Sequence, residues 1–304
     1  MKKDNDATKH KYRMVALDLD GTLLGPDHTI SDTAIDYLNH LHNKGFLVTL
    51  ATGRSSASTF DTIKRLRFPL SDPHGIPVVC FNGAMCMKVK GSDDVFTGNV
   101  AVTELFHQPV PHSVTQSVLG FAAKMGHVVQ YYKGTQIYEH SKTESHRKLI
   151  QRYADLTGIK HVHCNDEYQS VLAESLPSKL LVLCDEDEVD EVTDQLNKEI
   201  GGEANIVRGS PPFFVEILHK EVCKGRGVER MCEAMGVKLE EVVAFGDGDN
   251  DIEFIQVAGC GIAMKNARIT VKDVADEVCE WSNAEDGVIL KLQQMEKDQL
   301  LRYY

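Results

Sequence analysis

Residues 14–23 read MVALDLDGTL, in which an apolar run ends abruptly in two aspartates. The run from Val15 to Leu19 has the composition of a strand that is buried on both faces. Asp18 and Asp20 stand where this strand leaves the core, and side chains at positions i and i+2 of a strand point to the same side. The stretch therefore predicts a pair of carboxylates aimed at a common point beyond a buried strand.

The composition is that of an ordinary globular protein, with 304 residues of which 42% are hydrophobic and 26% charged. The 33 basic and 45 acidic residues give a net charge of −12. This balance argues against a nucleic-acid or anionic-membrane partner, either of which needs a basic surface. The longest apolar runs, such as residues 180–184, are also too short to cross a bilayer. A small anionic substrate remains compatible with the charge, because a local cluster of cations can override the global field.

The cysteines and the start of the chain indicate where the protein works. The polar start at residues 1–13 has no apolar segment like that of a signal peptide. None of the eight cysteines has C-x-x-C spacing, which is typical of buried free thiols in a reducing compartment. The stretch HVHC at 161–164 lacks the second ligand pair of a zinc site. We therefore expect a cytoplasmic protein, and an organelle matrix fits the same signals.

Strand-like and helical segments alternate at both ends of the chain. We expect strands at residues 15–19, 46–50, 78–81, 242–245 and 261–263. We expect helices at residues 32–44, 56–67 and 225–235, a short one after residue 251, and a last one ending by residue 295. Ser31 is placed to cap the first helix. This alternation predicts an α/β fold class with a doubly wound parallel sheet.

The middle of the chain has a different pattern and predicts an inserted α+β cap domain. It contains a hairpin-like stretch, VVQYYKGTQIYE at 128–139, and helical patterns at about 113–125, 144–157 and 187–199. We assign residues 1–86 to the first part of the core, with 1–13 as a frayed leader, 87–212 to the cap, and 213–304 to the second part of the core. Pro211 and Pro212 mark the predicted return hinge.

Polar residues follow the first four predicted strands of the core. In an open α/β sheet the ligand crevice lies beyond the carboxyl ends of the strands, so these residues should converge. They are Asp18 and Asp20 after the first strand, Thr52, Gly53 and Arg54 after the second, Asn82 and Gly83 after the third, and Asp247, Asn250 and Asp251 after the fourth.

The aspartates among these residues predict a divalent cation. Up to four partly desolvated carboxylates repel one another unless a positive charge pairs with them. All-oxygen ligands suit Mg²⁺, whereas zinc favours His or Cys. A Ca²⁺ loop in GDGDND (246–251) fails, because its required glycine would fall on Ile252 and its closing glutamate on Ala258.

The same residues can carry out chemistry on phosphorus. An aspartate carboxylate can attack a phosphoryl group, and a second aspartate can protonate the leaving oxygen and then deprotonate a water. Lys224 at a helix start can supply a fixed positive charge. The backbone amides of Gly21 and Gly53 and the Thr52 hydroxyl can hold phosphoryl oxygens.

The motifs DLDGTL (18–23), ATGR (51–54), NGA (82–84), KG (224–225) and GDGDND (246–251) resemble those of the haloacid dehalogenase superfamily of phosphatases. The C-terminal stretches GIAMKNA (261–267) and NAEDGV (283–288) are similar to its Cof-type sugar-phosphate phosphatase branch. In that branch an α+β cap is inserted between the second and third motifs. The resemblance covers the whole chain, in the cap by architecture more than by motif.

The resemblance implies a role for each site residue. Asp18 would be the nucleophile and a Mg²⁺ ligand, and Asp20 would be the general acid/base and a ligand through its backbone carbonyl. Asp247 would complete the protein ligands, with Asp251 close by or acting through water. Thr52 and Lys224 would hold the phosphoryl group, and Lys224 would also orient Asp18. Asn250 would form a hydrogen bond to Lys224 or to the phosphate, and Arg54 and Asn82 would line the cleft. Asp249, where the branch often has Glu, would face away from the metal.

These expectations describe a Mg²⁺-dependent phosphomonoesterase acting on a small phosphorylated metabolite, with a sugar phosphate as the favoured substrate class. Two other functions stay open at this point. A phosphomutase of the same superfamily would move the phosphoryl group between positions of a sugar. A catalytically silent sensor would bind a phosphorylated ligand, although inert relatives would be expected to lose Asp18 or Asp20, which are both present here.

Overall fold

Strand β1 (Met14–Leu17) lies between two parallel neighbours that come from opposite ends of the chain, β12 (Val242–Gly246) and β2 (Leu47–Ala51). The computed structural model describes residues 10–66, 75–91, 100–209 and 211–303. Within these residues β1 belongs to an eight-stranded sheet with the order β14-β13-β12-β1-β2-β3-β4-β5. Its remaining strands are β3 (Ile76–Cys80), β4 (Met85–Gly91), β5 (Val100–His107), β13 (Cys260–Ala263) and β14 (Glu277–Val278).

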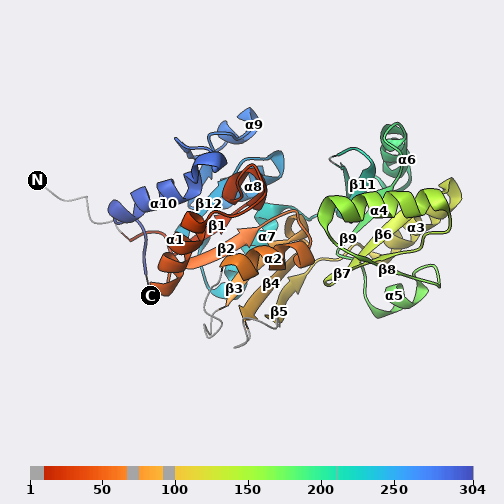
Figure 1. Ribbon diagram of the computed structural model, residues 1–304, viewed down its shortest axis with the longest axis horizontal. Helices are drawn as coiled ribbons and strands as arrows, with labels where there is room; N and C mark the ends of the chain where they lie inside the picture. Colours follow the sequence, from red (N-terminus) through yellow and green to blue (C-terminus); the bar gives the residue numbers. More distant parts are fainter. Residues whose placement is uncertain (1–9, 67–74, 92–99, 210, 304) are drawn as a thin grey trace, which may run out of the picture. The chain divides into compact units, whose positions relative to one another are not determined.

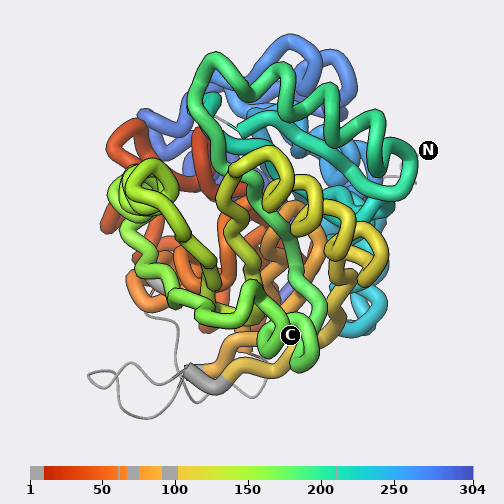
Figure 2. The backbone as a smooth tube through the Cα atoms, turned by 90° about the vertical axis from the view of Figure 1, so that its right-hand side faces the viewer, coloured from red at the N-terminus to blue at the C-terminus, as the bar shows by residue number. Residues whose placement is uncertain are grey.

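The chain divides into two units, which we call the core unit and the inserted unit. The core unit comprises residues 1–54, 59–106 and 223–304, and the inserted unit comprises residues 55–58 and 107–222. In Figure 2 residues 107–222 run from yellow through green to turquoise.

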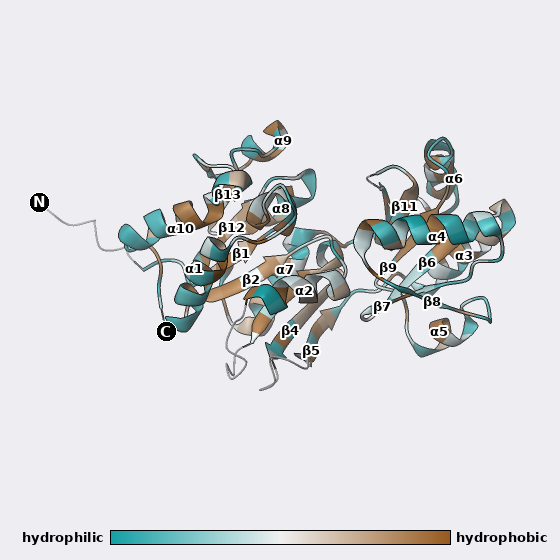
Figure 3. Ribbon diagram, in the orientation of Figure 1, coloured by the Kyte–Doolittle hydropathy of each residue, from teal (hydrophilic) through white to brown (hydrophobic). Residues whose placement is uncertain are grey.

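The core sheet is parallel from β14 to β3 and turns antiparallel at β4. The central strands β1 and β12 are buried along their whole length, and Figure 3 colours them as hydrophobic. Helices α7 and α8 pack against each other and against the sheet, and α1 packs against α10. The helices of this unit are α1 (Asp32–Asn43), most of α2 (Ser56–Leu66), α7 (Lys224–Met235), α8 (Ile252–Val257), α9 (Ile269–Lys272) and α10 (Gly287–Lys297).

The local signals in the core sequence produce the expected elements. Ser31 accepts a hydrogen bond from the Ala34 amide at 3.0 Å, which caps α1 as predicted. Short helical turns fill the connections at Leu19–Leu23 (η1), Phe81–Gly83 (η2), Leu239–Glu241 (η3), Asp249–Asp251 (η4) and Asn283–Glu285 (η5). The α/β class with a mainly parallel sheet is confirmed.

The inserted unit has its own sheet, with the order β10-β11-β9-β6-β7-β8 among the described residues. Its strands pair antiparallel, except that β7 and β8 are parallel. The strands are β6 (Val128–Lys133), β7 (Gln136–Glu139), β8 (His161–His163), β9 (Lys179–Leu183), β10 (Ala204–Arg208) and β11 (Phe214–His219). The helices are α3 (His112–Met125), α4 (Glu144–Thr157), α5 (Gln169–Glu174) and α6 (Val189–Ile200) (Figure 1).

The two faces of this second sheet are filled differently. Apolar side chains of α3, α5 and α6 pack with Val129, Tyr131 and Val182 in one hydrophobic cluster. Gln130 and Tyr132, which alternate with these positions along β6, belong to a buried polar network instead. The predicted hairpin at 128–139 is present as β6 and β7.

The boundaries of the inserted unit lie elsewhere than predicted. We expected them at residues 87 and 212, whereas the chain divides after residues 106 and 222. Strands β4 and β5 extend the core sheet, and β11 pairs with β9 and β10 in the second sheet. Pro211 and Pro212 therefore precede the last strand of the inserted unit and are not the return hinge.

The predicted frayed leader also needs correction. Residues 1–9, like residue 67 of the predicted second helix, lie outside the described residues. Residues 10–13 are not frayed, because Tyr12 donates its amide to the Leu300 carbonyl and accepts from the Arg302 amide. The Tyr12 side chain is buried, and Arg13 forms an ion pair with Glu241. No helix in the described part of the chain combines the length and hydrophobicity of a membrane span.

Candidate active site

The loop that leaves β1 carries the first aspartates. Asp18 is 5% exposed, and the residues after it form the wide turn η1. Gly21 has a φ of +77°, and a Cβ at this position would lie 2.3 Å from Oδ2 of Asp247. Glycine adopts a positive φ without steric cost and has no side chain, so the turn can lie directly against Asp247.

Lys224, the first residue of α7, lies between two of the carboxylates. Its Nζ is 2.6 Å from Oδ1 of Asp18 and 2.5 Å from Oδ1 of Asp251. The lysine side chain is 1% exposed. Burial lowers the pKa of Lys224, but the two carboxylates raise it more, so its pKa lies above the usual range and the ammonium stays charged.

Small residues let α7 begin at this place. A Cβ on Gly83 would lie 2.2 Å from the carbonyl oxygen of Cys223, and a Cβ on Gly227 would lie 2.7 Å from the Cα of Gly83. The backbone of α7 therefore touches the turn after β3. This contact fixes where Lys224 enters the site.

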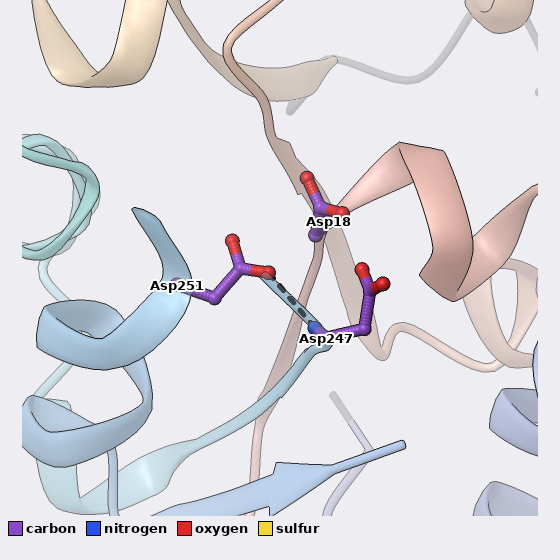
Figure 4. Close-up of side chains that lie close together, drawn as sticks. All are labelled: Asp18, Asp247 and Asp251. Carbon is purple, nitrogen blue, oxygen red and sulfur yellow. Dashed lines mark hydrogen bonds between the residues drawn. The ribbon is translucent and has the colours of Figure 1, made fainter. Parts of the chain in front are cut away.

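Asp18, Asp247 and Asp251 form a cluster that can hold a metal ion, with one oxygen from each lying within 4.8 Å of the others. Figure 4 shows their carboxylates gathered around one region, with Asp251 bonded to the backbone nitrogen of Asp247. Oδ2 of Asp251 accepts from the amides of Asp247 and Gly248, each at 2.9 Å. The Thr22 hydroxyl donates to Oδ1 of Asp247 at 3.1 Å. Asp251 thus holds the loop after β12 and Lys224 together, and Thr22 orients Asp247.

The charges of this cluster do not balance, because three carboxylates surround one ammonium. Burial raises the pKa of Asp18 well above its usual range; Lys224 opposes this rise, and Asp251 and Asp247 add to it. Burial and the neighbouring Asp251 raise the pKa of Asp247 to about 6. Two negative charges in excess, on oxygen ligands, match a hard divalent cation, so the residues present fit a metal of this kind.

Asp20 does not join the cluster through its carboxylate. The Arg54 guanidinium donates from Nε to its Oδ2 at 2.7 Å and from Nη2 to its Oδ1, and Nδ1 of His28 lies 3.0 Å from Oδ1. Burial raises the pKa of Asp20, but the bonds from Arg54 and His28 lower it more, and the net pKa lies below the usual range. The carboxylate is therefore held as an anion in this arrangement.

The residues after β2 and β3 meet beside the acidic loops. A Cβ on Gly53 would lie 2.8 Å from Oδ1 of Asn82, so glycine permits this close approach. The same Asn82 oxygen accepts from Nδ2 of Asn250 at 3.0 Å. The buried Thr52 hydroxyl accepts from the Arg54 amide at 3.1 Å. Asn250 therefore contacts Asn82, whereas Lys224 is engaged by Asp18 and Asp251.

No role was predicted for Thr22, His28 and Asn266, whose side chains hydrogen-bond to Asp247, Asp20 and the Gly21 carbonyl of the acidic loops. Thr22 could have been found from its place inside DLDGTL. His28 has no recognisable signal, since it lies in a loop and has a φ of +57°. Asp249 pairs with Arg268 and Thr270 at the surface, as expected for a residue that faces away from the cluster.

The comparisons with known proteins agree with this fold. Residues 15–292 match the family of haloacid dehalogenase-like hydrolases. The chain is 30% identical over 280 residues to the 5-amino-6-(5-phospho-D-ribitylamino)uracil phosphatase YitU of Bacillus subtilis, covering 91% of this chain and 95% of YitU. It is 26% identical over 277 residues to the putative phosphatase YxeH of Bacillus subtilis, covering 91% and 96%. The crystal structure of TM0651 from Thermotoga maritima superposes with a TM-score of 0.79 at 25% identity, covering 93% and 97%.

The fold and the matched sequence define a hydrolase of the α/β class that acts on phosphorylated compounds. The chain belongs to the haloacid dehalogenase-like hydrolase family, in its Cof-type branch. It is a phosphatase of this superfamily, acting on a phosphorylated small molecule.

Proposed function

We propose that the protein is a Mg²⁺-dependent phosphomonoester hydrolase that uses Asp18 as its nucleophile on a sugar phosphate. The observation that carries the proposal is the environment of Asp18. Its carboxylate is buried at the end of a central strand, one oxygen is fixed by Lys224, and two further carboxylates lie alongside. A carboxylate without a catalytic or metal-binding task would be costly to bury in such a place.

In the first step an oxygen of Asp18 attacks phosphorus, and the bond from phosphorus to the ester oxygen breaks. Lys224 keeps Asp18 oriented and adds a positive charge beside the negative charge of the phosphoryl group. The leaving alkoxide takes a proton from Asp20, and an aspartyl-phosphate remains. In the second step water attacks phosphorus, Asp20 accepts the proton of the water, and the bond from phosphorus to Asp18 breaks to release phosphate.

The proton transfers require Asp20 to change its partners. As placed, its carboxylate is engaged by Arg54 and His28, which keep it ionised. We infer that Asp20 leaves Arg54 when substrate binds, because an anionic phosphoryl group competes for the same guanidinium. Without this partner the pKa of Asp20 rises, so Asp20 takes up from solvent the proton that it then gives to the leaving oxygen, and it regains a proton from the attacking water in the second step.

Asp18, Asp247 and the backbone carbonyl of Asp20 would hold the Mg²⁺ ion, with Asp251 supporting the loop of Asp247. When bound, the ion offsets the negative charge that the phosphoryl group brings to the carboxylates. We assign the phosphoryl oxygens to the Thr52 hydroxyl, the Gly53 amide, Lys224 and Asn250.

The substrate class is supported by a relative. YitU, at 30% identity, is named for a substrate that carries its phosphate on a ribityl chain. A phosphorylated polyhydroxy chain of this kind is chemically close to a sugar phosphate. We therefore propose small phosphorylated sugars and sugar alcohols as the first compounds to screen.

The test is phosphate release by the purified protein, first from a generic aryl phosphate and then from sugar phosphates. We expect turnover with Mg²⁺ and none with excess chelator. Asp247→Ala should abolish Mg²⁺ binding measured by calorimetry, since it removes a ligand of the ion. Asp249→Ala is the matched control, because this aspartate of the same loop faces Arg268 and should leave binding intact.

Each alternative outcome points to a different function. Isomerisation of a hexose phosphate without phosphate release would establish a phosphomutase. Binding of phosphorylated ligands by folded protein without any turnover would establish a silent sensor.

A further inference from the structure

One short turn of the core unit, residues 264–268 with the sequence MKNAR, touches both acidic loops. The Met264 amide donates to the Gly246 carbonyl at 3.0 Å, and the Arg268 amide donates to the Asp247 carbonyl at 3.0 Å. From between these two contacts, Nδ2 of Asn266 donates to the Gly21 carbonyl at 2.7 Å. The turn therefore connects the loop of Asp247 to the loop of Asp18 and Asp20.

The Asn266 amide group is itself fixed on its other side. Its Oδ1 accepts from the backbone amide of Asn283 at 3.0 Å. The turn is closed by a hydrogen bond from the Ala267 amide to the Met264 carbonyl at 2.9 Å. With both ends of its amide engaged, Asn266 presents its donor to Gly21 in one orientation.

The Gly21 backbone is a sensitive place for such a contact. Gly21 follows Asp20, and the space where its Cβ would lie is filled by the Asp247 carboxylate, 2.3 Å away. The next residue, Thr22, donates its hydroxyl to the other oxygen of Asp247. A rotation of the peptide between Gly21 and Thr22 would therefore move both neighbours of Asp247 as well as Asp20.

We propose that Asn266 is a positioning residue for the catalytic loop. Its hydrogen bond to the Gly21 carbonyl sets the distance between the carboxylates on the loop after β1 and the carboxylate on the loop after β12. The inference rests on the proposed function for its kinetic readout, and Mg²⁺ affinity provides an independent one.

The test compares Asn266→Ala with Asn283→Ala. The Asn283 side chain makes a similar bond from the same C-terminal segment, since its Nδ2 donates to the Leu24 carbonyl at 2.8 Å, beyond the site. For Asn266→Ala we expect kcat to fall about tenfold and Mg²⁺ affinity to weaken about tenfold, the effect of one lost hydrogen bond, with KM within about twofold. Both variants lose hydrogen bonding between a side chain and the backbone, so we expect Tm to fall by a similar amount in both. For Asn283→Ala we expect kcat and Mg²⁺ affinity to stay within about twofold of wild type.

A second variant distinguishes the two hydrogen bonds of the Asn266 side chain. Asn266→Asp keeps an acceptor for the Asn283 amide and removes the donor to Gly21, so kcat should fall at least as far as in Asn266→Ala. Wild-type kcat in Asn266→Asp would overturn the proposal, as would equal losses in Asn266→Ala and Asn283→Ala. If wild-type protein bound Mg²⁺ without turning over any phosphate ester, the proposed function would fail, and the Mg²⁺ affinities alone would decide the role of Asn266.

Discussion

Two buried lysines show how differently the two units treat charge. In the core unit Lys224 meets Asp18 and Asp251, with Asp247 close by, so negative charge is in excess. In the inserted unit Lys179 is 4% exposed, lies 3.1 Å from Glu216, and has its Nζ 4.9 Å from the centre of the Tyr132 ring. In both cases burial lowers the lysine pKa and the carboxylates raise it more.

The two clusters differ in their net charge. Lys179 and Glu216 neutralise each other within a network in which the Tyr132 hydroxyl is hydrogen-bonded to both Gln130 and the Tyr153 hydroxyl. The cluster around Lys224 is left with an excess of two negative charges. Buried carboxylates that only stabilised the fold would be expected to have their charges neutralised. An unbalanced buried cluster therefore marks a site that can hold a cation, and a balanced one fits a structural element.

The largest effect is expected for Asp18→Asn, which removes one charge of the excess and the proposed nucleophile. Turnover should fall by at least about a thousandfold, because a carboxamide is a poor nucleophile toward phosphorus. The measurement is single-turnover phosphate release, with circular dichroism to establish that the variant is folded. Asp249→Asn, a matched change on an exposed aspartate, should retain wild-type turnover; a folded and active Asp18→Asn would refute the assignment.

The two lysines can then be compared directly by substituting methionine. Lys224→Met should reduce turnover about a hundredfold or more, because Asp18 loses its orienting partner. Lys179→Met should leave turnover of an aryl phosphate within about threefold, while lowering the free energy of unfolding by about 3 kcal/mol through the unpaired Glu216. Urea unfolding and steady-state kinetics on both variants check these outcomes.

The double variant Lys179→Met/Glu216→Leu sharpens the same comparison. If the pair in the inserted unit is only structural, an apolar replacement should recover most of the stability lost in Lys179→Met. A double variant that is as unstable as the single one would show that Glu216 has a further role.

The smallest effect concerns a half-buried cluster at the surface, in which one carboxylate accepts hydrogen bonds from several donors. Glu296 is contacted by Lys44 at 2.7 Å, Tyr303 at 2.6 Å and Tyr37 at 2.9 Å. Burial raises its pKa, but these hydrogen bonds lower it more, from 4.5 to about 2. Glu296→Gln should cost about 1 kcal/mol of unfolding free energy at pH 7, discounted for solvent screening.

The pH dependence of this effect has a definite sign. The folded protein binds the Glu296 proton more weakly than the unfolded chain, so the stabilisation is present above pH 4.5 and disappears as the pH falls toward 2. The difference in unfolding free energy between wild type and Glu296→Gln should therefore shrink between pH 5 and pH 3. A difference that stays constant over this range would contradict the assignment.

Several elements of both units could be predicted from local sequence. The buried runs at β1 and β12, the Ser31 cap and the hairpin of β6 and β7 are each encoded within a few residues. The meeting of Asp18 with Asp247 and Asp251 also followed, because parallel strands end at one edge of a sheet.

The rest depends on contacts between distant segments. Nothing within β4 or β11 specifies which of two sheets it joins, since strand pairing is decided by partners elsewhere in the chain. The same holds for the bond from Asn266 to Gly21 and for the pairing of Asp20 with Arg54 and His28. Periodicity indicates that a residue is near a site, but it does not identify the atom that the side chain contacts.

The pairing of β1 with β12 has a consequence for biosynthesis. Met14 lies opposite Val242, so the centre of the core sheet cannot close until the ribosome has made more than two-thirds of the chain. The inserted unit is almost continuous in sequence and can gather its contacts earlier. We expect the nascent protein to stay catalytically inert until its last segment emerges, because Lys224 and Asp247 are synthesised long after Asp18.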